Sequence, residues 1–204
     1  MKNTKEKIIA KALELFNNDG VKETTLRKIA RELGISQGNL TYHYKTKDEI
    51  IEKIYFDLAE KMNTEMQKMT VQSSSMQVLY TSSSITMKGL YAYRFLLRDL
   101  YKILKESEKL KVHYAQLQQL RTQQTSQIFT ALVQEEMVRP PEFEGEYERF
   151  YERLNILGDN WINAHELLTD QIADPVKHYV DLLVEMLYPY LTEKGKKAYW
   201  EVIQ

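Results

Sequence analysis

The sequence predicts an all-α protein built from about nine to ten helices. Glycine and proline are scarce, with seven and four residues in a chain of 204, so little turn chemistry is available. Apolar residues recur at intervals of three and four along most of the chain, which is the spacing of one helix face. The alternation of apolar and polar residues that marks half-buried strands is missing.

Residues 1–46 are expected to form three short helices. The first runs from about Thr4 to Asn18, with Asn3 or Thr4 as its N-cap and Asp19-Gly20 as its stop. The apolar stripe of this helix is expected to pack across the next two helices and to close a small hydrophobic core.

Two helices joined by a tight turn are predicted for residues 24–44. In the first of them, four apolar residues share one face: Leu26, Ile29, Ala30 and Leu33. Thr24 is expected to cap this helix, and Gly34 follows it where a left-handed residue is needed. Ser36 then caps the short second helix, whose only aliphatic anchor is Leu40. Its polar side chains are left to face outward, as in a DNA-reading helix-turn-helix.

A connecting helix is expected at 47–69, because Thr46 and Glu49 have the spacing of a capping box. The small polar residues of 70–75, TVQSSS, mark a domain boundary after it. The remaining part, residues 70–204, is expected to be helical, with prolines that begin or end its helices. The helices predicted in it are 76–90, 93–105, 106–137, 145–170, 175–190 and 193–203.

One combination of residues in the first quarter of the chain is specific enough to indicate a family. Its members are Gly20, Val21, Thr24, Thr25, Leu26, Arg27, Lys28, Ile29, Ala30, Leu33, Gly34, Ile35, Ser36, Gly38, Asn39, Leu40, Tyr42, His43, Tyr44, Lys45, Thr46 and Lys47. This pattern resembles the N-terminal domain of the tetracycline-repressor (TetR/AcrR) family of bacterial transcriptional regulators. Thr41 departs from it, since the family usually has an aromatic residue there.

The resemblance implies which residues contact DNA. They are Thr25, Arg27, Lys28, Ser36, Gln37, Gly38, Asn39, Thr41, Tyr42, His43 and Lys47. Arg27 matches the base-contacting arginine of the family, and a guanidinium group can bond both O6 and N7 of guanine. Gln37 and Asn39 can bond adenine in a similar bidentate way. Gly38 lets the backbone approach the groove closely.

Tyr42, His43 and Lys47 match positions that contact the DNA backbone in the family and would fix the register of the protein. For Tyr42, packing beneath the motif is an open alternative. Lys47 lies in the first turn of a helix, where backbone N–H groups and the helix dipole favour a phosphate. Thr41 can offer a methyl group to thymine or a hydroxyl group to a phosphate, and Lys45 is expected close to a phosphate.

Composition is consistent with this interpretation. Residues 1–50 hold ten Lys and Arg against seven Asp and Glu, whereas the remainder holds 18 against 22. A basic N-terminal part suits phosphate binding, although solvated helices often carry such a charge. Cysteine is absent, and no apolar run has the length of a signal peptide or of a membrane helix. We expect a soluble protein of the cytoplasm that contacts no membrane.

The resemblance also implies that residues 70–204 bind a ligand and dimerise. The helices at about 145–170 and 175–190 bury more than one face, and an intramolecular core accounts for part of this burial. The family implies that they also form a four-helix bundle with the same pair of a second subunit. Such a dimer would place two DNA-reading helices one turn of DNA apart, about 34–36 Å, on a palindromic operator.

The sequence suggests residues that could line an effector cavity in this part, but it does not single any of them out. Met87, Tyr91, Tyr93, Phe95, Tyr114, Met137 and Trp161 could line it, but such residues at helical spacing are more often plain core. Four polar residues could orient a ligand or pair with one another: Arg94, Arg98, Asp99 and His113. The sequence leaves both questions open.

An enzymatic function is not expected. The sequence lacks a phosphate-binding loop, a dinucleotide-binding glycine pattern and the metalloprotease motif His-Glu-x-x-His. No cofactor or metal is expected, and His43 has no second ligand near it in sequence. The favoured function is a homodimeric repressor that leaves its operator when a small molecule binds the C-terminal part. The alternative is a helical ligand-binding or interaction protein that does not read DNA sequence.

Overall fold

The protein is helical throughout the residues that the computed structural model describes, which are 4–68, 74–168 and 172–203. These residues contain eleven α-helices, one short 3₁₀ helix and no strand, and an isolated antiparallel bridge joins Val138 to Leu191. The all-α prediction is therefore confirmed. The predicted helix boundaries at Asn3, Met69 and Asp170 lie outside the described residues, as do residues 70–73 of the predicted boundary segment.

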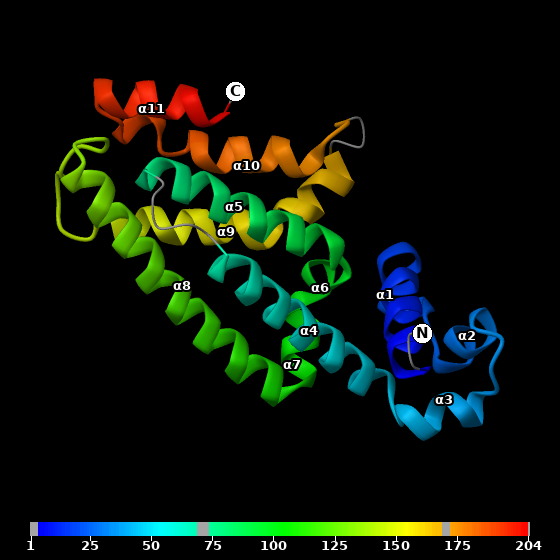
Figure 1. Cartoon of the computed structure of the whole chain (residues 1–204). Helices are drawn as coiled ribbons and strands as arrows, with labels where there is room; N and C mark the ends of the chain where they lie inside the picture. Colours follow the sequence, from blue (N-terminus) through cyan, green and yellow to red (C-terminus); the bar gives the residue numbers. More distant parts are fainter. Residues whose placement is uncertain (1–3, 69–73, 169–171, 204) are drawn as a thin grey trace.

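The N-terminal helices form a small head with its own core. The head consists of α1 (Thr4–Glu23), α2 (Leu26–Glu32) and α3 (Gln37–His43), and α4 (Lys47–Gln67) leads away from it (Figure 1). Its core comprises the almost fully buried Ile8, Ala12, Phe16, Ile29, Ala30, Leu40 and Ile50. The helix α1 contacts α2 and α4, so the predicted packing of the first helix against the motif is confirmed for α2.

The turn between α2 and α3 forms as predicted. Gly34 has a φ of 66°, and the N–H of Ile35 donates to the carbonyl of Ala30 at 3.1 Å, which ends α2 in a Schellman motif. Ser36 caps α3 by accepting the Asn39 N–H at 3.1 Å. Thr46 likewise caps α4, where it accepts the Glu49 N–H at 3.1 Å.

The predicted cap of α2 is wrong by one residue. Thr25, not Thr24, is the N-cap, and its hydroxyl oxygen accepts the Lys28 N–H at 3.1 Å. Thr24 is fully buried, and its hydroxyl group donates to the carbonyl of Gly20 at 2.9 Å. Gly20, with φ 83° and ψ 163°, interrupts α1 where a stop was predicted, and one further helical turn follows it. Thr24 therefore secures the end of α1 instead of the start of α2.

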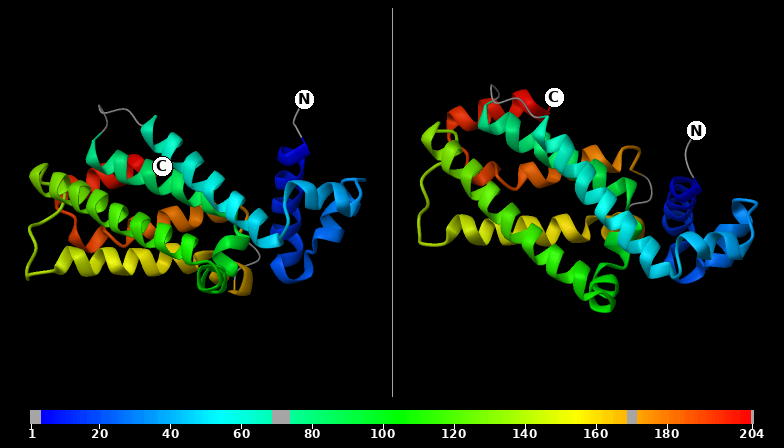
Figure 2. Two further views of the ribbon diagram at one scale, coloured as in Figure 1. Left: turned by 90° about the horizontal axis from the view of Figure 1, so that it is seen from below. Right: turned by 60° about the horizontal axis from the view of Figure 1, so that its bottom comes forward.

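The larger part of the chain, here called the body, is a layered bundle around α5. Its helices are α5 (Ser75–Ala92), α6 (Phe95–Arg98), α7 (Leu100–Glu106), α8 (Glu108–Gln134), α9 (Glu146–Leu168), α10 (Pro175–Glu185) and α11 (Glu193–Ile203). The central helix α5 contacts α4, α8, α10 and α11. In both views of Figure 2 the head projects from one end of the body, and the connection between α8 and α9 lies at the other end.

Three predicted helices of the body, those at 93–105, 106–137 and 175–190, end earlier than expected, the last of them at Glu185. The segment 93–105 breaks at Asp99 into α6 and α7, so the structure has one helix more than the upper expectation. The helix predicted to reach residue 137 ends at Gln134, because Glu136 adopts a φ of 58°. Val138 then turns inward, is buried and pairs with Leu191. Pro189 lies in the 3₁₀ helix Tyr188–Tyr190 that follows α10.

The head is joined to the body by hydrogen bonds as well as by α4. The side chain of Asn17 in α1 donates to the Ala92 carbonyl at 2.8 Å and accepts the Phe95 N–H at 3.1 Å. Arg98 donates to the backbone carbonyl of Asn17 at 2.6 Å and forms an ion pair with Glu166 of α9. The end of α1 is thereby tied to α5, α6 and α9 at one place.

The connection between α8 and α9 is held by an ion pair whose carboxylate is buried and whose arginine is partly exposed. Arg139 donates two hydrogen bonds to the Glu146 carboxylate, at 2.9 and 2.6 Å, and Glu146 also accepts the Glu142 N–H at 2.7 Å. The hydrogen bonds from Arg139 lower the pKa of the Glu146 carboxyl group from 4.5 to about 2. The paired, ionised form is therefore the one that fits the folded chain.

This pair is expected to make the stability of the body fall in acid. Because folding lowers the pKa of Glu146, its contribution is fully present above about pH 4.5 and is lost as the pH falls towards 2. Urea-unfolding midpoints measured between these limits should decline more steeply in the parent protein than in Glu146→Gln, which no longer titrates at this position. Parallel declines in the two proteins would contradict this assignment.

Candidate nucleic-acid interface

The helix α3 exposes the polar side chains that the sequence assigned to DNA reading. Leu40 is completely buried and holds the helix against the head. Ser36, Gln37, Gly38 and Asn39 are exposed around it. A β-carbon added to Gly38 would meet only the Ser36 hydroxyl oxygen, at 3.9 Å, so this part of the backbone is open to an approaching surface. The first turn of α3 therefore presents amide side chains and bare backbone together.

The end of α3 presents an aromatic pair. Tyr42 is 85% exposed, which rules out the alternative that it packs beneath the motif. Its ring lies edge-to-face with that of His43, with 5.2 Å between the centroids. The hydroxyl group of Thr41 donates back to the carbonyl of Gln37 at 3.0 Å and to that of Gly38 at 3.2 Å. This proton is therefore used within α3, while the Thr41 methyl group remains for an apolar contact.

Arg27 extends this surface from the neighbouring helix. It is the second residue of α2, is exposed, and has no ion-pair partner among the residues that the structure describes. Thr25, two residues before Arg27, is also exposed, but its hydroxyl oxygen already caps α2. An exposed guanidinium on α2, the helix that contacts α3, is suited to a bidentate contact with a base edge.

Two of the assigned lysines are held by contacts within the chain. Lys28 Nζ lies 3.1 Å from Asp19 Oδ2, and Lys47 Nζ donates to the Val21 carbonyl at 2.6 Å. An ammonium group has three donors, so either lysine can keep this contact and also bond a phosphate. The contacts orient both amines next to the helix-turn-helix before any ligand is present.

Backbone N–H groups at the start of α4 are already hydrogen-bonded by side chains of the chain itself, one of them in a way that was not predicted from the sequence. Glu49 was expected to complete a capping box by accepting the Thr46 N–H. It accepts the N–H of Lys45 at 2.7 Å instead, one residue earlier. A carboxylate therefore already lies at this helix terminus, so Lys47 acts as a point charge more than as part of an open anion site.

The cavity residues suggested for the body mostly belong to its core. Met87, Phe95 and Trp161 are almost completely buried, and of the seven candidates only Tyr114 lines a cavity among α4, α5, α6, α8 and α9. This cavity holds about 50 Å³ and is otherwise lined largely by leucines. Tyr114 donates to Asp159 at 2.5 Å, and burial with this hydrogen bond raises its pKa.

The suggested polar residues of the body do not pair with one another. Arg98 binds Asn17 and Glu166, while Arg94 lies 3.5 Å from the side-chain oxygen of Asn18. His113 shares a 3.0 Å hydrogen bond with the Tyr55 hydroxyl group. Asp99 stands at the break between α6 and α7. Arg94 and Arg98 thus serve the joint between head and body.

The described residues form neither a metal site nor a membrane-spanning helix. Within residues 4–68, 74–168 and 172–203, no group of three or more His, Cys, Asp or Glu side chains is placed to hold a metal ion. Over the same residues, no helix combines the length and the apolar character that crossing a bilayer requires.

The fold and the exposed surface of α2 and α3 define a helix-turn-helix protein. A family model for bacterial regulatory proteins of the tetR family matches residues 8–54, and one for a bacterial transcriptional repressor matches residues 57–199. The chain therefore belongs to the TetR family of bacterial transcriptional regulators, which are not enzymes. Regulators of this family bind DNA and small-molecule effectors and typically form dimers.

Individual relatives match mainly over part of their length. The HTH-type transcriptional regulator QacR of Staphylococcus aureus is 29% identical over 102 residues, covering 48% of this chain and 54% of that protein. The regulator TtgW of Pseudomonas putida is 38% identical over 53 residues, covering 26% of this chain and 40% of that protein. The chain thus spans about half, or less, of the length of these curated relatives.

Solved structures share the whole fold. A TetR-family transcriptional regulator from Marinobacter aquaeolei superposes with a TM-score of 0.86 at 22% identity, covering 99% of this chain and 98% of that one. A bacterial regulatory protein of the tetR family from Rhodococcus gives a TM-score of 0.71 at 20% identity, covering 95% and 100%. At this level of identity, the likeness concerns the arrangement of the helices.

Proposed function

We propose that this protein is a sequence-specific DNA-binding repressor, which reads DNA through α3 and the start of α2. The observation that carries this proposal is the first turn of α3. Gln37, Gly38 and Asn39 are exposed there, and Arg27 is exposed on α2, the helix that contacts α3, without an ion-pair partner among the described residues. A surface helix anchored by one leucine, with amide groups on its outer face, matches the donors and acceptors of the major groove.

The proposed DNA contacts divide into two kinds. Arg27, Gln37 and Asn39 read base edges, and Gly38 permits the close approach that this requires. The other assigned residues set the register through the phosphates and sugars: Thr25, Lys28, Ser36, Thr41, Tyr42, His43 and Lys47. For Thr41, we favour its methyl group as the contact, because its hydroxyl proton is bonded within α3.

Lys47 provides a test of the second kind of contact. Lys47→Ala should weaken binding to all duplexes alike and lower the salt dependence by about one counterion. Fluorescence anisotropy against salt, on a selected and on a random duplex, measures both effects. Lys197→Ala, an exposed lysine of α11 far from α3, is the matched control and should leave binding unchanged. A loss confined to the selected duplex would show that Lys47 reads sequence.

The proposed assembly is a homodimer through α9 and α10. Four large apolar residues are unusually exposed on these helices: Ile156 at 67%, Leu167 at 81%, Leu168 at 78% and Leu182 at 38%. A second copy would remove this surface from water and pair two heads for a palindromic operator. Light scattering at micromolar concentration should give twice the mass of the chain, 24.2 kDa. A monomer would disprove the dimer but leave DNA reading by a single head open.

We further propose that a small-molecule effector acts through the cavity beside Tyr114. Leucine side chains from α5, α6, α7 and α8 line it, and Arg121 and Asp159 provide its polar edge. Tyr114 itself is held by hydrogen bonds to Asp159 and from Gln118. Because the cavity holds only about 50 Å³, the leucine side chains would move apart to admit an apolar effector, whose polar group would then meet Arg121 or Asp159.

The effector would act by changing how the heads are held. The proposed division is a DNA-binding domain at 1–46, a connecting helix at 47–69 and a ligand-binding and dimerisation domain at 70–204. A ligand that binds better when α4 is tilted would lower DNA affinity, and DNA would lower ligand affinity by the same factor. Since its proposed binding partner is chromosomal DNA, we propose that the protein acts in the cytoplasm.

The deciding experiment is selection of binding sites from random duplexes at two salt concentrations. A recovered palindrome whose affinity falls steeply with salt is the expected result, since neutralised phosphates release counterions. Absence of any enriched sequence, with binding lost at physiological salt, would overturn the proposal. The protein would then be better described as a helical ligand-binding or interaction protein whose head is only a charged surface.

A further inference from the structure

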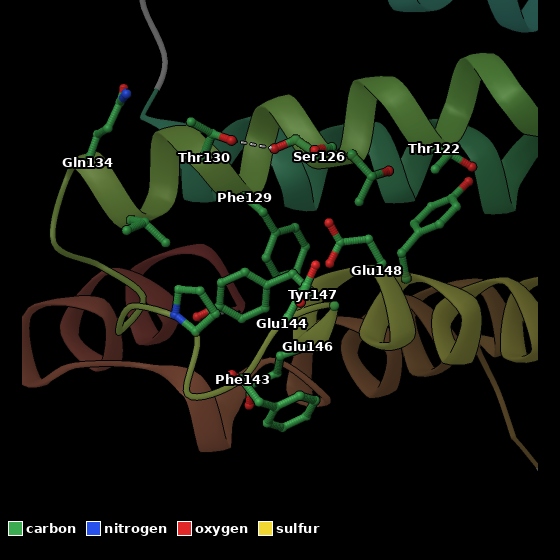
Figure 3. A pocket seen from close by; sticks show the side chains of 15 residues that line it. Thr122, Ser126, Phe129, Thr130, Gln134, Phe143, Glu144, Glu146, Tyr147 and Glu148 are labelled. Atoms are coloured by element: carbon green, nitrogen blue, oxygen red, sulfur yellow. Dashed lines mark hydrogen bonds between the residues drawn. The ribbon is translucent and has the colours of Figure 1, made fainter.

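A second cavity lies between α8 and α9 (Figure 3). The connection of these two helices is at the end of the body away from the head (Figure 2). It is an open groove of about 360 Å³, bounded by the last turns of α8, the first turns of α9 and the connection between them. It shares no residue with the small cavity beside Tyr114. Its volume lies within the range of small-molecule sites.

The walls of this groove are aromatic. Phe129 of α8 faces Tyr147 of α9, with 5.2 Å between the ring centroids, as Figure 3 shows. Phe143 and Tyr151 add two further rings. The upper rim carries hydroxyl groups from Thr122, Ser126 and Thr130 of α8, and the Thr130 hydroxyl group donates to the Ser126 carbonyl at 2.9 Å. Such walls hold flat apolar groups and favour cations over their faces.

The charge of the groove is negative. Its lining includes Glu144, Glu146 and Glu148 but no lysine, arginine or histidine. Glu146 is neutralised by Arg139, whereas Glu144 and Glu148 have no ion-pair partner among the residues that the structure describes. Arg149, close to the rim, lies over the Phe143 ring at 5.7 Å. The carboxylate of Glu148 projects into the space between the two helices (Figure 3).

One buried polar group in the groove lacks a partner. Tyr151 is only 9% exposed, and its hydroxyl group makes no hydrogen bond within the described chain. Buried hydroxyl groups are normally bonded, because leaving one unpaired costs its full hydration. Because Tyr151 lines the groove, a ligand that displaces the atoms covering its hydroxyl group would supply the missing partner.

We propose that this groove binds a small organic cation, an ammonium ion carrying an aromatic group. The ring would lie among Phe129, Tyr147 and Tyr151, and the ammonium group would face Glu148 and donate to the Tyr151 hydroxyl oxygen. The inference is independent of DNA reading, since it rests on the α8–α9 groove alone and is tested without DNA.

The test compares three ligands of one shape and different charge. The full-length protein is titrated calorimetrically with 2-phenylethylammonium, 2-phenylethanol and phenylacetate in turn. The cation, 2-phenylethylammonium, should show saturable binding of one molecule per chain. The alcohol should bind more weakly, and the anion should not bind. Equal binding of all three ligands, or no binding of the cation, would overturn the proposal.

Two variants of groove residues, Glu148→Gln and Tyr151→Phe, test whether the cation binds in the groove. Glu148→Gln should weaken the cation about tenfold, the effect of losing one close charge pair. Glu152→Gln, one turn further along α9 and outside the groove, removes the same charge and should have no effect. Tyr151→Phe should weaken the cation without lowering the melting temperature of the free protein. Equal losses in the two glutamate variants would mean that the cation responds only to overall charge.

Discussion

Replacing Asn17 with alanine is expected to cost about 2–4 kcal/mol of folding free energy, because it leaves two buried partners unsatisfied. The lost bonds are those to the Ala92 carbonyl and from the Phe95 N–H. Asn17 itself is only 7% exposed, so water reaches neither partner easily. Urea unfolding of the full-length protein measures the change, and hydrogen exchange at the Phe95 amide should accelerate with it.

The neighbouring residue provides the control for this experiment. Asn18 is exposed and makes a single long contact with Arg94, at 3.5 Å, so Asn18→Ala should change stability by less than about 0.5 kcal/mol. If the two variants unfolded alike, Asn17 would not be the bond that holds the head against the body. Fast exchange at Phe95 without a loss of stability would indicate instead that this joint opens locally.

Replacing Arg27 with alanine is expected to weaken binding to the selected duplex by about 1–3 kcal/mol, which is a factor of roughly 5 to 150. On a duplex mutated at the base pair that Arg27 contacts, Arg27→Ala should lose less affinity, because the parent protein has already lost that contact there. Binding curves on the selected duplex and on its single-base variants measure both effects. Arg27 forms no ion pair with any of the described residues, so its removal should leave stability unchanged.

Arg31→Ala separates base reading from charge. Arg31 lies on the same helix, is largely exposed and pairs only with the adjacent Glu32. Its removal takes away the same charge, so it should weaken selected and random duplexes equally and by less. If Arg27→Ala behaved in the same way, Arg27 would be a phosphate contact, and base reading would rest on Gln37 and Asn39.

The elements that the sequence predicted well are those governed by local geometry. Gly34, Ser36 and Thr46 act within three residues of their own position, through a left-handed backbone or a side-chain cap. These contacts need no distant partner, so residue type and spacing are sufficient. The same holds for the order of the helices and for the exposed amide groups of α3, since Leu40 alone was available as an anchor.

Prediction from the sequence was less reliable where two neighbouring residues could fill the same structural position, such as a helix N-cap. Thr24 and Thr25 are both good caps, and only the burial of Thr24 beneath α1 assigns the cap to Thr25. The helix predicted at 145–170 was expected to bury more than one face, yet Leu168 and Ile156 of this helix are exposed, while Trp161 is fully buried. Helical spacing defines a face but not what covers it.

By itself, the sequence determined the class of this protein: an all-α fold with a helix-turn-helix whose outer face is polar. These properties follow from short-range rules and from hydrophobic periodicity, both of which are written into neighbouring residues. Only the tertiary structure decided how Asn17 ties α1 to the body and which lysines are held by Asp19 and Val21. It also decided that the larger groove lies between α8 and α9. Contacts between residues far apart in the chain depend on how the helices pack, and periodicity carries no information about that.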